Sequence, residues 1–339
     1  MPRTQVISAS RTKDIVRWSP DVLAAVLAGR AACRFGRGGK PHILDRDAVH
    51  TLVLWTKDPG NIVRHGALRQ ALGALVAAGA KVYLQLTATG LGGTFVEHNV
   101  PTTAETAQGL GDALDSGLVA PGAVKLRYDP LIFLRAGRVR LSNMRRDLFV
   151  EVLDAFAALG VEDVVTSYVD FESYPKVRRR IEAVGLEVIE VEEKAVREFV
   201  EWMAEQCHGR AMRFDTCAAP AIPFGREGCI SGSRFNALMA ERCGPAAPRC
   251  TTQLHNERTP GGQRSRCRCT FSRDIGYSRG FTTCYTHGSG CLYCYSHHEA
   301  LGPKLLPAVQ REVDALVSNP EAFLAEPAHA AYRGIASLE

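Results

Sequence analysis

The sequence has no long hydrophobic run, and no apolar stretch reaches the roughly 18 residues that a membrane-spanning helix requires. It has no hydrophobic region of the secretory type at its start, where residues 1–7 lead directly into a predicted strand. Neither a G-x-G-x-x-G turn nor a P-loop is present, which argues against a nicotinamide or nucleoside-triphosphate site. We therefore expect a cytoplasmic protein with no membrane partner.

Cysteine is almost absent from the first 200 residues, where Cys33 is the only one. The other ten of the eleven cysteines lie between Cys207 and Cys294. Disulfides are rare in a reducing compartment, so clustered cysteines there favour metal binding or catalysis. Cys33 and Cys207 fall in helical patterns and are most simply explained as structural thiols.

A strong excess of charge of one sign is also missing, because the formal net charge is +5. The densest basic run contains Arg258, Arg264, Arg266, Arg268 and Arg273. One interpretation is a solvated loop whose positive charge lies beside thiolates. The other is contact with a nucleic acid or another phosphate-bearing partner.

Short β-branched runs alternate with helical patterns over the first 215 residues. This alternation predicts a parallel sheet wrapped by helices, an α/β fold of the partial (β/α)6 TIM-barrel type. We expect the barrel over residues 1–216, a cysteine-rich region that caps its mouth over 217–300, and a C-terminal helix and tail over 301–339. The predicted strands are Gln5–Ser10, Thr51–Thr56, Lys81–Thr87, Ala123–Arg127, Asp163–Tyr168 and Met212–Thr216, with a seventh candidate at Leu186–Val191. The predicted helices include Asn61–Ala78, Thr103–Asp115, Arg145–Leu159, Glu192–Cys207 and a final one, Leu305–Val317, expected to pack on the barrel.

Polar residues follow each of the six predicted barrel strands. In such folds the loops after the strands collect the functional groups, so these residues predict one shared pocket. Any one of them has an ordinary alternative, as a helix N-cap or as a member of a salt bridge within the rim. The candidates at the first four strand ends are Ser10, Arg11, Asp14, Trp55, Lys57, Gln85, Thr87, Arg127, Tyr128 and Asp129.

Three cysteines near the end of the chain form a C-x6-C-x2-C pattern, Cys284, Cys291 and Cys294. Three thiolates from one loop can hold three irons of a [4Fe–4S] cluster and leave the fourth iron open to a small molecule. Zinc is an alternative if a histidine (His287, His297 or His298) completes four ligands. A role as free thiols is a third reading.

A second group comprises Cys217, Cys229, Cys267 and Cys269. Four thiolates are a complete ligand set for an auxiliary iron–sulfur cluster or a structural zinc. The ordinary alternative is two unrelated pairs of buried thiols. Cys243 and Cys250 are further candidates in the same region.

Several of these segments resemble domain-of-unknown-function family 1848, over roughly residues 5–300. The similar segments are residues 7–12 (ISASRT), 54–59 (LWTKDP), 126–131 (LRYDPL), 267–277 and 290–295 (GCLYCY). Cys217 and Cys229 also match cysteine positions of the family. The family in turn resembles radical S-adenosylmethionine enzymes, through the cysteine loop and an Arg-x-Asp-Pro segment similar to that of spore photoproduct lyases. Two departures are the position of the triad at the far end of the chain and its six-residue first gap.

This second resemblance implies an enzyme with S-adenosylmethionine as cofactor and an electron donor such as a flavodoxin or ferredoxin. The open iron would chelate the amino and carboxylate groups of the cofactor, and reduction would cleave a carbon–sulfur bond to give a carbon radical. Arg127, Asp129 and Lys57 are then the candidate catalytic residues, with Arg127 and Lys57 pairing with carboxylate or phosphate. The candidates for cofactor binding are Ser10, Arg11, Asp14, Trp55, Gln85, Thr87 and Tyr128, with Trp55 or Tyr128 stacking on adenine.

A non-catalytic module is the rival hypothesis. Zinc or iron–sulfur clusters would then staple a basic loop that binds nucleic acid, with an affinity that falls steeply with salt. The polar strand ends argue against it, because a stapled binding module does not need them.

Overall fold

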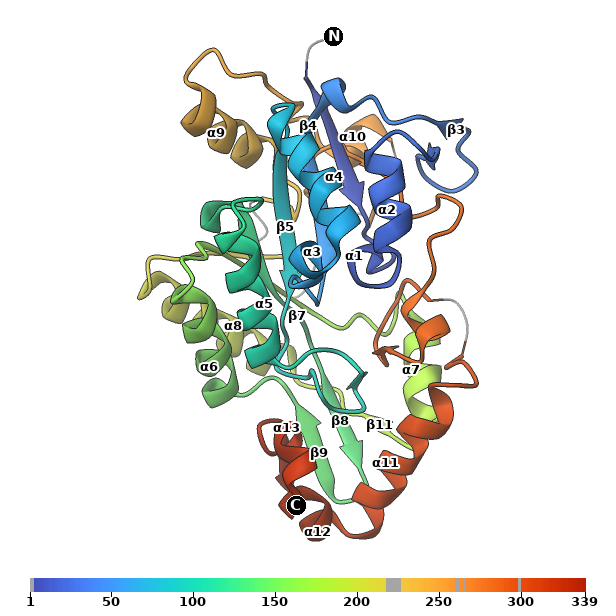
Figure 1. The fold of residues 1–339 in the computed structure, drawn as a ribbon. Helices are drawn as coiled ribbons and strands as arrows, with labels where there is room; N and C mark the ends of the chain where they lie inside the picture. Colours follow the sequence, from blue (N-terminus) through green and yellow to red (C-terminus); the bar gives the residue numbers. More distant parts are fainter. Residues whose placement is uncertain (1–2, 218–226, 260–262, 265, 298–299) are drawn as a thin grey trace.

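The computed structural model describes residues 3–217, 227–259, 263–264, 266–297 and 300–339. Its centre is a seven-stranded sheet in the order β12-β10-β7-β5-β4-β1-β13, in which every pair of neighbours is parallel (Figure 1). The strands are β1 (Gln5–Ala9), β4 (Val49–Thr56), β5 (Lys81–Thr87), β7 (Val124–Leu131), β10 (Asp163–Tyr168), β12 (Arg213–Thr216) and β13 (Arg273–Asp274). The central strands β4, β5 and β7 are buried along almost their whole length, which fits a sheet covered on both faces.

The prediction of an α/β fold with a parallel sheet is confirmed, and all six predicted barrel strands lie in this sheet. Within this sheet, each strand from β1 to β12 pairs with the sheet's next strand along the chain, and β13 pairs with β1 at the edge opposite β12. In the part of the chain that the structure describes, no ladder joins β12 to β13. The structure thus shows a parallel sheet, and it does not show a closed barrel.

Two predicted elements differ from the structure, and one observed strand was not predicted. The candidate strand at Leu186–Val191 shrinks to β11 (Glu187–Val188), which pairs antiparallel with β8 (Phe133–Ala136) in a second sheet. The helix expected over Asn61–Ala78 divides into α3 (Asn61–Arg64) and α4 (Gly66–Ala77), because His65 has an extended backbone. The strand β13 was not predicted, since two residues carry no readable alternation.

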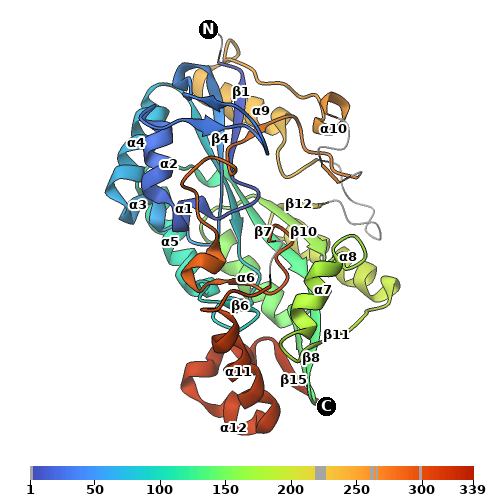
Figure 2. The same cartoon turned by 90° about the vertical axis from the view of Figure 1, so that its right-hand side faces the viewer.

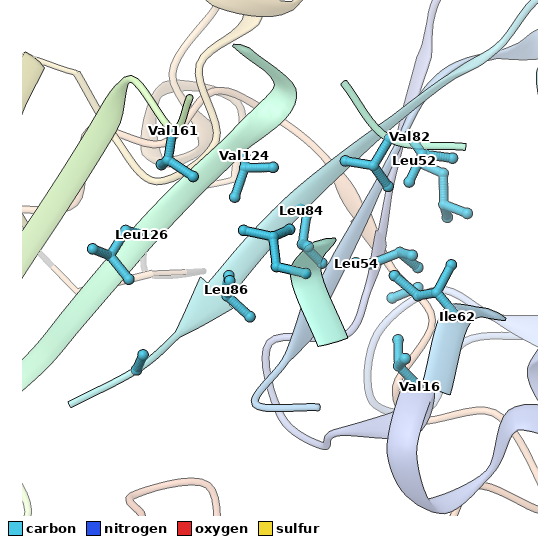
Figure 3. Packing of buried hydrophobic residues seen from close by; sticks show 14 of the residues in the cluster. Val16, Leu52, Leu54, Ile62, Val82, Leu84, Leu86, Val124, Leu126 and Val161 are labelled. Atoms are coloured by element: carbon cyan, nitrogen blue, oxygen red, sulfur yellow. The ribbon is translucent and has the colours of Figure 1, made fainter. Parts of the chain in front are cut away.

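Helices cover one face of the sheet, as Figure 2 shows. Alternate residues of the strands supply the apolar side chains on this face, and Figure 3 shows them packed together, for example Leu52 and Leu54 of β4 with Leu84 of β5. Burying each such side chain contributes about 1.5–3 kcal/mol. The covering helices are α1 (Ile15–Trp18), α2 (Pro20–Leu27), α4, α5 (Thr103–Asp115), α6 (Arg146–Ala157) and α8 (Glu193–His208).

The cysteine-rich segment covers part of the opposite face. Val53 of β4 and Tyr83 of β5 point to this side and pack with Cys229, Phe235 and Cys269. Helix α9 (Gly232–Cys243) closes the end at which the strands begin: Lys81 donates to the carbonyl of Leu238, and Arg242 donates to that of Ala80. At the opposite end, where the strands finish, polar residues on this face of the sheet lie beside the cysteines.

A second, antiparallel sheet has the order β11-β8-β9-β15, where β9 spans Val139–Ser142 and β15 spans Ala336–Leu338. The final predicted helix is observed as α11 (Leu306–Ser318), and it packs with this small sheet in a separate apolar cluster, so its expected packing on the barrel was wrong. The cluster also contains Tyr285, Leu292 and Tyr293 of the cysteine triad segment. The small sheet and its helices thereby support the triad from below in Figure 1.

The remaining elements are short and connect these layers. They are β2 (Cys33–Arg34), β3 (Pro41–His42), η1 (Arg46–Ala48), β6 (Glu97–His98), η2 (Pro121–Ala123), α7 (Pro175–Glu182), α10 (His255–Arg258), η3 (Cys284–His287), β14 (Gly290–Cys291), α12 (Pro320–Ala325), η4 (Pro327–His329) and α13 (Ala330–Arg333).

Candidate metal centre

A cavity of about 650 Å³ lies at the end of the sheet where the parallel strands finish. All seven cysteines predicted as metal ligands line it, and so do eight of the ten polar candidates. The lining members of the predicted set are Cys217, Cys229, Cys267, Cys269, Cys284, Cys291, Cys294, Ser10, Arg11, Asp14, Trp55, Lys57, Thr87, Arg127 and Asp129. Gln85 and Tyr128 are not among the lining residues.

Tyr128 lies on the wrong face of the sheet to meet a ligand. Side chains alternate along β7, so Arg127 and Asp129 point to the cavity and Tyr128 between them points to the helices. It is fully buried, its ring packs edge-on against Phe149, and its hydroxyl donates to the carbonyl of Asn143 across 2.6 Å. The structure therefore gives Tyr128 a packing role, and of the two aromatic candidates only Trp55 lines the cavity.

Gln85 lies on the cavity side but beneath the cysteine segment. Its amide donates to the backbone carbonyl of Cys229, and its side-chain oxygen lies 3.5 Å from a guanidinium nitrogen of Arg127. Gln85 is fully buried. The arrangement places it as a support for Cys229 instead of a group that faces a ligand.

The second cysteine group is drawn together at the cavity wall. The Sγ atoms of Cys217 and Cys229 lie 3.3 Å apart, and Arg127 donates to the Sγ atom of Cys229 across 2.7 Å. Gly228 makes the approach possible, because a Cβ there would lie 2.3 Å from the backbone nitrogen of Cys269. The structure thus brings together residues that are far apart in sequence, as the ligand-set hypothesis requires.

Protons are unevenly shared within this group. Hydrogen bonds from Cys217 and Cys269, together with the charges of Arg127 and Lys125, hold the pKa of Cys229 well below the usual thiol value. A hydrogen bond from Cys269 lowers the pKa of Cys267 to about 7. The partners that donate these hydrogen bonds, Cys217 and Cys269, have raised pKa values. The main cause is the hydrogen bond that each makes to a neighbouring sulfur. The lowered pKa values favour the thiolate forms of Cys229 and Cys267, and a bound cation would release the protons of Cys217 and Cys269.

The triad is built from three short pieces. Cys284 begins η3, Cys291 lies in β14, and Cys294 follows a turn in which its amide donates to the carbonyl of Cys291 across 3.1 Å. Gly290 has a φ of +152°, and a Cβ there would lie 2.3 Å from the ring of Tyr285. Only glycine therefore lets the chain cross that ring, and the Tyr285 hydroxyl donates to the carbonyl of Cys291 across 2.9 Å.

Burial dominates the electrostatics of the triad thiols. It raises the pKa of Cys284 to about 12 and also raises the pKa of Cys291 well above the usual thiol value, although Lys57 opposes the latter shift. Neutral buried thiols gain from a cation that takes the place of their protons, because the thiolate is the form that binds metal. The chemistry of this donor set therefore fits a thiolate-bound metal or cluster.

Lys57 belongs to a buried network beside the triad. Its ammonium donates to Glu97 across 2.7 Å and to the hydroxyl of Tyr293 across 3.2 Å. Thr89 donates to the same Glu97 oxygen across 2.6 Å, and Glu97 pairs with Cys291 in the β6–β14 ladder. Burial disfavours charge on Lys57, yet Glu97 and Cys291 more than offset it, so the pKa of Lys57 is raised. Glu97 was not predicted, and its sequence signal is weak, a single carboxylate in the mixed segment 95–100 (FVEHNV).

Asp14 is occupied by the fold itself. One carboxylate oxygen accepts the backbone N–H of Arg17 across 3.0 Å, and the other accepts from the hydroxyl of Thr56 and the backbone N–H of Lys57. These bonds cap α1 and tie the loop after β1 to the loop after β4. The structure places Asp14 at the cavity wall, with its acceptors already engaged.

The other polar candidates from β1 and β4 also have partners. Ser10 lies 3.1 Å from the hydroxyl of Thr12, and Trp55 donates from its indole nitrogen to Ser8. Arg11 donates to Ser272, and its guanidinium lies over the ring of Trp55, as does that of Arg127. Arg11, Arg127 and Trp55 thus form a cationic and aromatic part of the cavity wall.

Histidines do not complete a tetrahedral site in the described residues. His287 stacks on Trp18, and His297 stacks on Tyr285 with ring centroids 3.8 Å apart. His298 lies outside the described residues. Within that described part, no group of three or more His, Cys, Asp or Glu side chains is arranged to hold a single metal ion. The seven thiols instead line one cavity.

The basic run does not form one surface. Arg264 turns into the cavity, where it lies over the ring of Tyr295 and donates to the Sγ atom of Cys217 across 3.4 Å. Arg266, Arg268 and Arg273 are exposed. The run thus combines a cation beside the thiols with a short solvated stretch.

The chain is thus an α/β protein with a seven-stranded parallel sheet and a cysteine-lined cavity at the carboxyl ends of the strands. Its family is shown by sequence: residues 6–296 match the model of the family described as "Domain of unknown function (DUF1848)", to which this chain belongs. No curated protein matches the chain. Within the described residues no helix is both long and apolar enough to cross a membrane.

Proposed function

We propose that this protein is an iron–sulfur enzyme of the radical S-adenosylmethionine type. The observation that carries the proposal is that Cys284, Cys291 and Cys294 come from one short segment and face a cavity at the carboxyl edge of a parallel sheet. Three thiolates would hold three irons of a [4Fe–4S] cluster and leave one iron open. When bound and reduced, such a cluster supplies an electron that breaks a carbon–sulfur bond of S-adenosylmethionine to give a carbon radical.

Lys57 is the residue best placed to bind an anionic group of the ligand near the triad. An ammonium group has three N–H donors, of which Glu97 and Tyr293 receive two. Glu97 keeps Lys57 charged despite its burial. We infer that the third donor binds a carboxylate in the cavity, while Glu97 and Tyr293 fix the direction of the ammonium group.

Trp55 and Thr87 line the same cavity as the two cysteine groups, where they would orient the ligand. Arg11 and Arg127 lie over the ring of Trp55 and fix its plane, which favours the stacking of a planar group. A volume of about 650 Å³ is in the range for small-molecule sites. It suits a cofactor with a small substrate, or with one unstacked base.

The group Cys217, Cys229, Cys267 and Cys269 would hold an auxiliary cluster, with zinc as the alternative. The support is its four thiols on one wall, two of which have lowered pKa values. Arg127 and Arg264 donate to its sulfurs and so offset thiolate charge. A flavodoxin or ferredoxin would supply the electrons.

Anaerobic reconstitution with iron and sulfide tests the proposal. We expect a brown protein with about four irons per chain for one cluster and about eight for two. With a strong reductant it should cleave a carbon–sulfur bond of S-adenosylmethionine. The triple variant Cys284→Ala, Cys291→Ala, Cys294→Ala should lose this cleavage and keep the auxiliary iron. Cys243→Ala is the matched control, because Cys243 is exposed and does not line the cavity.

Two results would overturn the proposal. One is a reconstituted wild-type protein that stays colourless and never cleaves S-adenosylmethionine. The other is a triple cysteine variant that cleaves it as fast as the wild type. Colourless protein with one or two zinc ions and a salt-dependent affinity for nucleic acid would instead favour the stapled binding module, whose exposed arginines are Arg266, Arg268 and Arg273.

A further inference from the structure

Arg180 of α7 lies against the triad segment. Its side chain is buried, with a residue exposure of 4%. The guanidinium donates to three backbone carbonyls, those of Leu292 at 3.1 Å, Cys294 at 2.7 Å and His297 at 3.0 Å. Its carbon atom also lies 5.4 Å from the centroid of the Tyr285 ring. One side chain thus contacts three points of the segment that contains the last two triad cysteines.

The triad segment has little regular structure of its own. Strand β14 contains only Gly290 and Cys291, and two backbone bonds follow it, from Leu292 to Val96 and from Cys294 to Cys291. Buried carbonyls without a donor cost about 1–3 kcal/mol each. Arg180 supplies donors to three carbonyls that the β6–β14 ladder does not reach.

We propose that Arg180 is a positioning residue, which holds residues 292–297 in the shape that directs Cys291 and Cys294 into the cavity. Arginine suits the task because its rigid planar fork donates in several fixed directions at once. Lysine carries the same charge on a single nitrogen, which cannot reach three separated carbonyls. No sequence motif indicates this role. Arg178, Arg179 and Arg180 are consecutive, and the sequence alone does not show which of the three is buried.

A second consequence rests on the proposed function. If the triad holds a cluster, the buried positive charge of Arg180 and its hydrogen bond to the Cys294 carbonyl favour the more negative, reduced form. Charge and hydrogen bonds around a cluster set its reduction potential. Arg180 then raises the potential of this centre relative to a variant with a neutral side chain.

Hydrogen–deuterium exchange of the metal-free protein tests the positioning role without any reference to the cluster. We expect Arg180→Leu to speed exchange at the amides of Leu292 and Cys294 by roughly tenfold or more, the effect of losing charge-assisted hydrogen bonds. The amide of Thr270, which donates to Ile230 in the other cysteine group, should be unchanged. Arg179→Leu is the matched control, because Arg179 is its exposed neighbour on the same helix.

Arg180→Lys separates shape from charge. We expect the amides of Leu292 and Cys294 to exchange as fast in this variant as in Arg180→Leu. The potential of the reconstituted cluster should stay near that of the wild type. Arg180→Leu should shift the potential to more negative values, and Arg179→Leu should leave it unchanged. If Arg180→Leu does not fold, as judged by circular dichroism, Arg180→Lys decides the positioning role by the same exchange measurement.

Unchanged exchange at Leu292 and Cys294 in a folded Arg180 variant overturns the positioning role. Equally faster exchange at Thr270 overturns it too, because the effect would then be global destabilisation. A wild-type protein that binds no iron removes the proposed function and the effect on potential, while the exchange result still decides the positioning role. The two failures are therefore distinguishable.

Discussion

Arg127 donates a hydrogen bond to the Sγ atom of Cys229 across 2.7 Å, which ties the central strand β7 to the cysteine-rich segment. The same guanidinium forms an ion pair with Asp129, and Ser167 donates to the other oxygen of that carboxylate. Burial disfavours charge on Arg127, but Cys229 and Asp129 more than compensate and raise its pKa well above the usual value. Arg127 therefore joins a thiolate and a carboxylate inside the protein.

Arg127→Met tests the strength of this junction. The substitution leaves Asp129 and the Cys229 thiolate without their cation, so we expect the free energy of unfolding to fall by about 3–5 kcal/mol. Urea denaturation at neutral pH measures the change. The double variant Arg127→Met, Asp129→Leu should recover part of the loss, because no uncompensated carboxylate stays buried. A single variant as stable as the wild type would contradict the buried junction.

Gly228→Ala tests the close contact that joins the two halves of the second cysteine group. The added Cβ would lie 2.3 Å from the nitrogen and 2.4 Å from the Cα of Cys269, and these backbone atoms cannot turn away. We expect a loss of about 1–3 kcal/mol in the free energy of unfolding from overpacking, together with reduced metal content of the second group. Gly66→Ala in α4 is the matched control, since a Cβ there meets nothing within 4 Å and the change should be neutral or slightly stabilising. Equal metal content in both variants would count against the contact.

Tyr128→Phe and Trp55→Leu test which face of the sheet carries the site. Tyr128→Phe removes one buried hydrogen bond to Asn143, so we expect a stability loss of about 1 kcal/mol and no effect on ligand affinity. Trp55→Leu removes an aromatic wall of the cavity and should weaken the binding of S-adenosylmethionine several-fold, as isothermal titration of the reconstituted protein would show. Weaker binding in Tyr128→Phe would mean that this residue reaches the cavity.

The positions of the strands were predictable because each one is a short apolar, β-branched run between helical patterns. Their faces were predictable in principle as well, since a period of two along β7 places Arg127 and Asp129 on one side and Tyr128 on the other. The same alternation directs Tyr128 to the helices, so its position at the strand end does not by itself make it a ligand-binding residue. The cysteine groups were easier to predict, because the clustering of cysteines toward the end of the chain is visible in the sequence itself.

Contacts between segments that are distant in the chain could not be predicted from the sequence. The pairing of β13 with β1 joins Asp274 to Ser8, and two residues of strand leave no pattern. The engagement of Asp14 by Thr56 and Lys57, and that of Gln85 by Cys229, are tertiary contacts that turn candidate ligand-binding groups into supports of the fold. Glu97 and Arg180 were missed for the same reason, because their partners lie about 200 and 110 residues away in the Cys284–Cys294 region.

Asp163 gives a prediction about pH at the opposite end of the sheet. Its carboxylate accepts hydrogen bonds from Arg213 at 2.8 and 3.0 Å and lies 3.4 Å from Arg234. Burial alone would raise its pKa, but the hydrogen bonds from Arg213 and the charge of Lys125 hold the pKa below the ordinary value. A carboxyl whose pKa is lower in the folded state stabilises the fold above its unfolded pKa, about 3.9, and loses that effect as pH falls through the folded value.

Asp163→Asn should therefore lower the free energy of unfolding by about 3 kcal/mol at pH 7, as expected for a partly buried ion pair that loses one partner. The difference from the wild type should shrink as the pH falls from about 3.9 toward the lower pKa of the folded carboxyl, because the unfolded chain takes up its proton first and the folded carboxyl does so only at that lower pH. Urea denaturation at a series of pH values measures this gap. Glu162→Gln is the control: Glu162 contacts the same arginines from an exposed position, so its loss should cost less than about 1 kcal/mol. A gap for Asp163→Asn that stays constant down to pH 3 would show that charge on Asp163 is not what stabilises this end of the sheet.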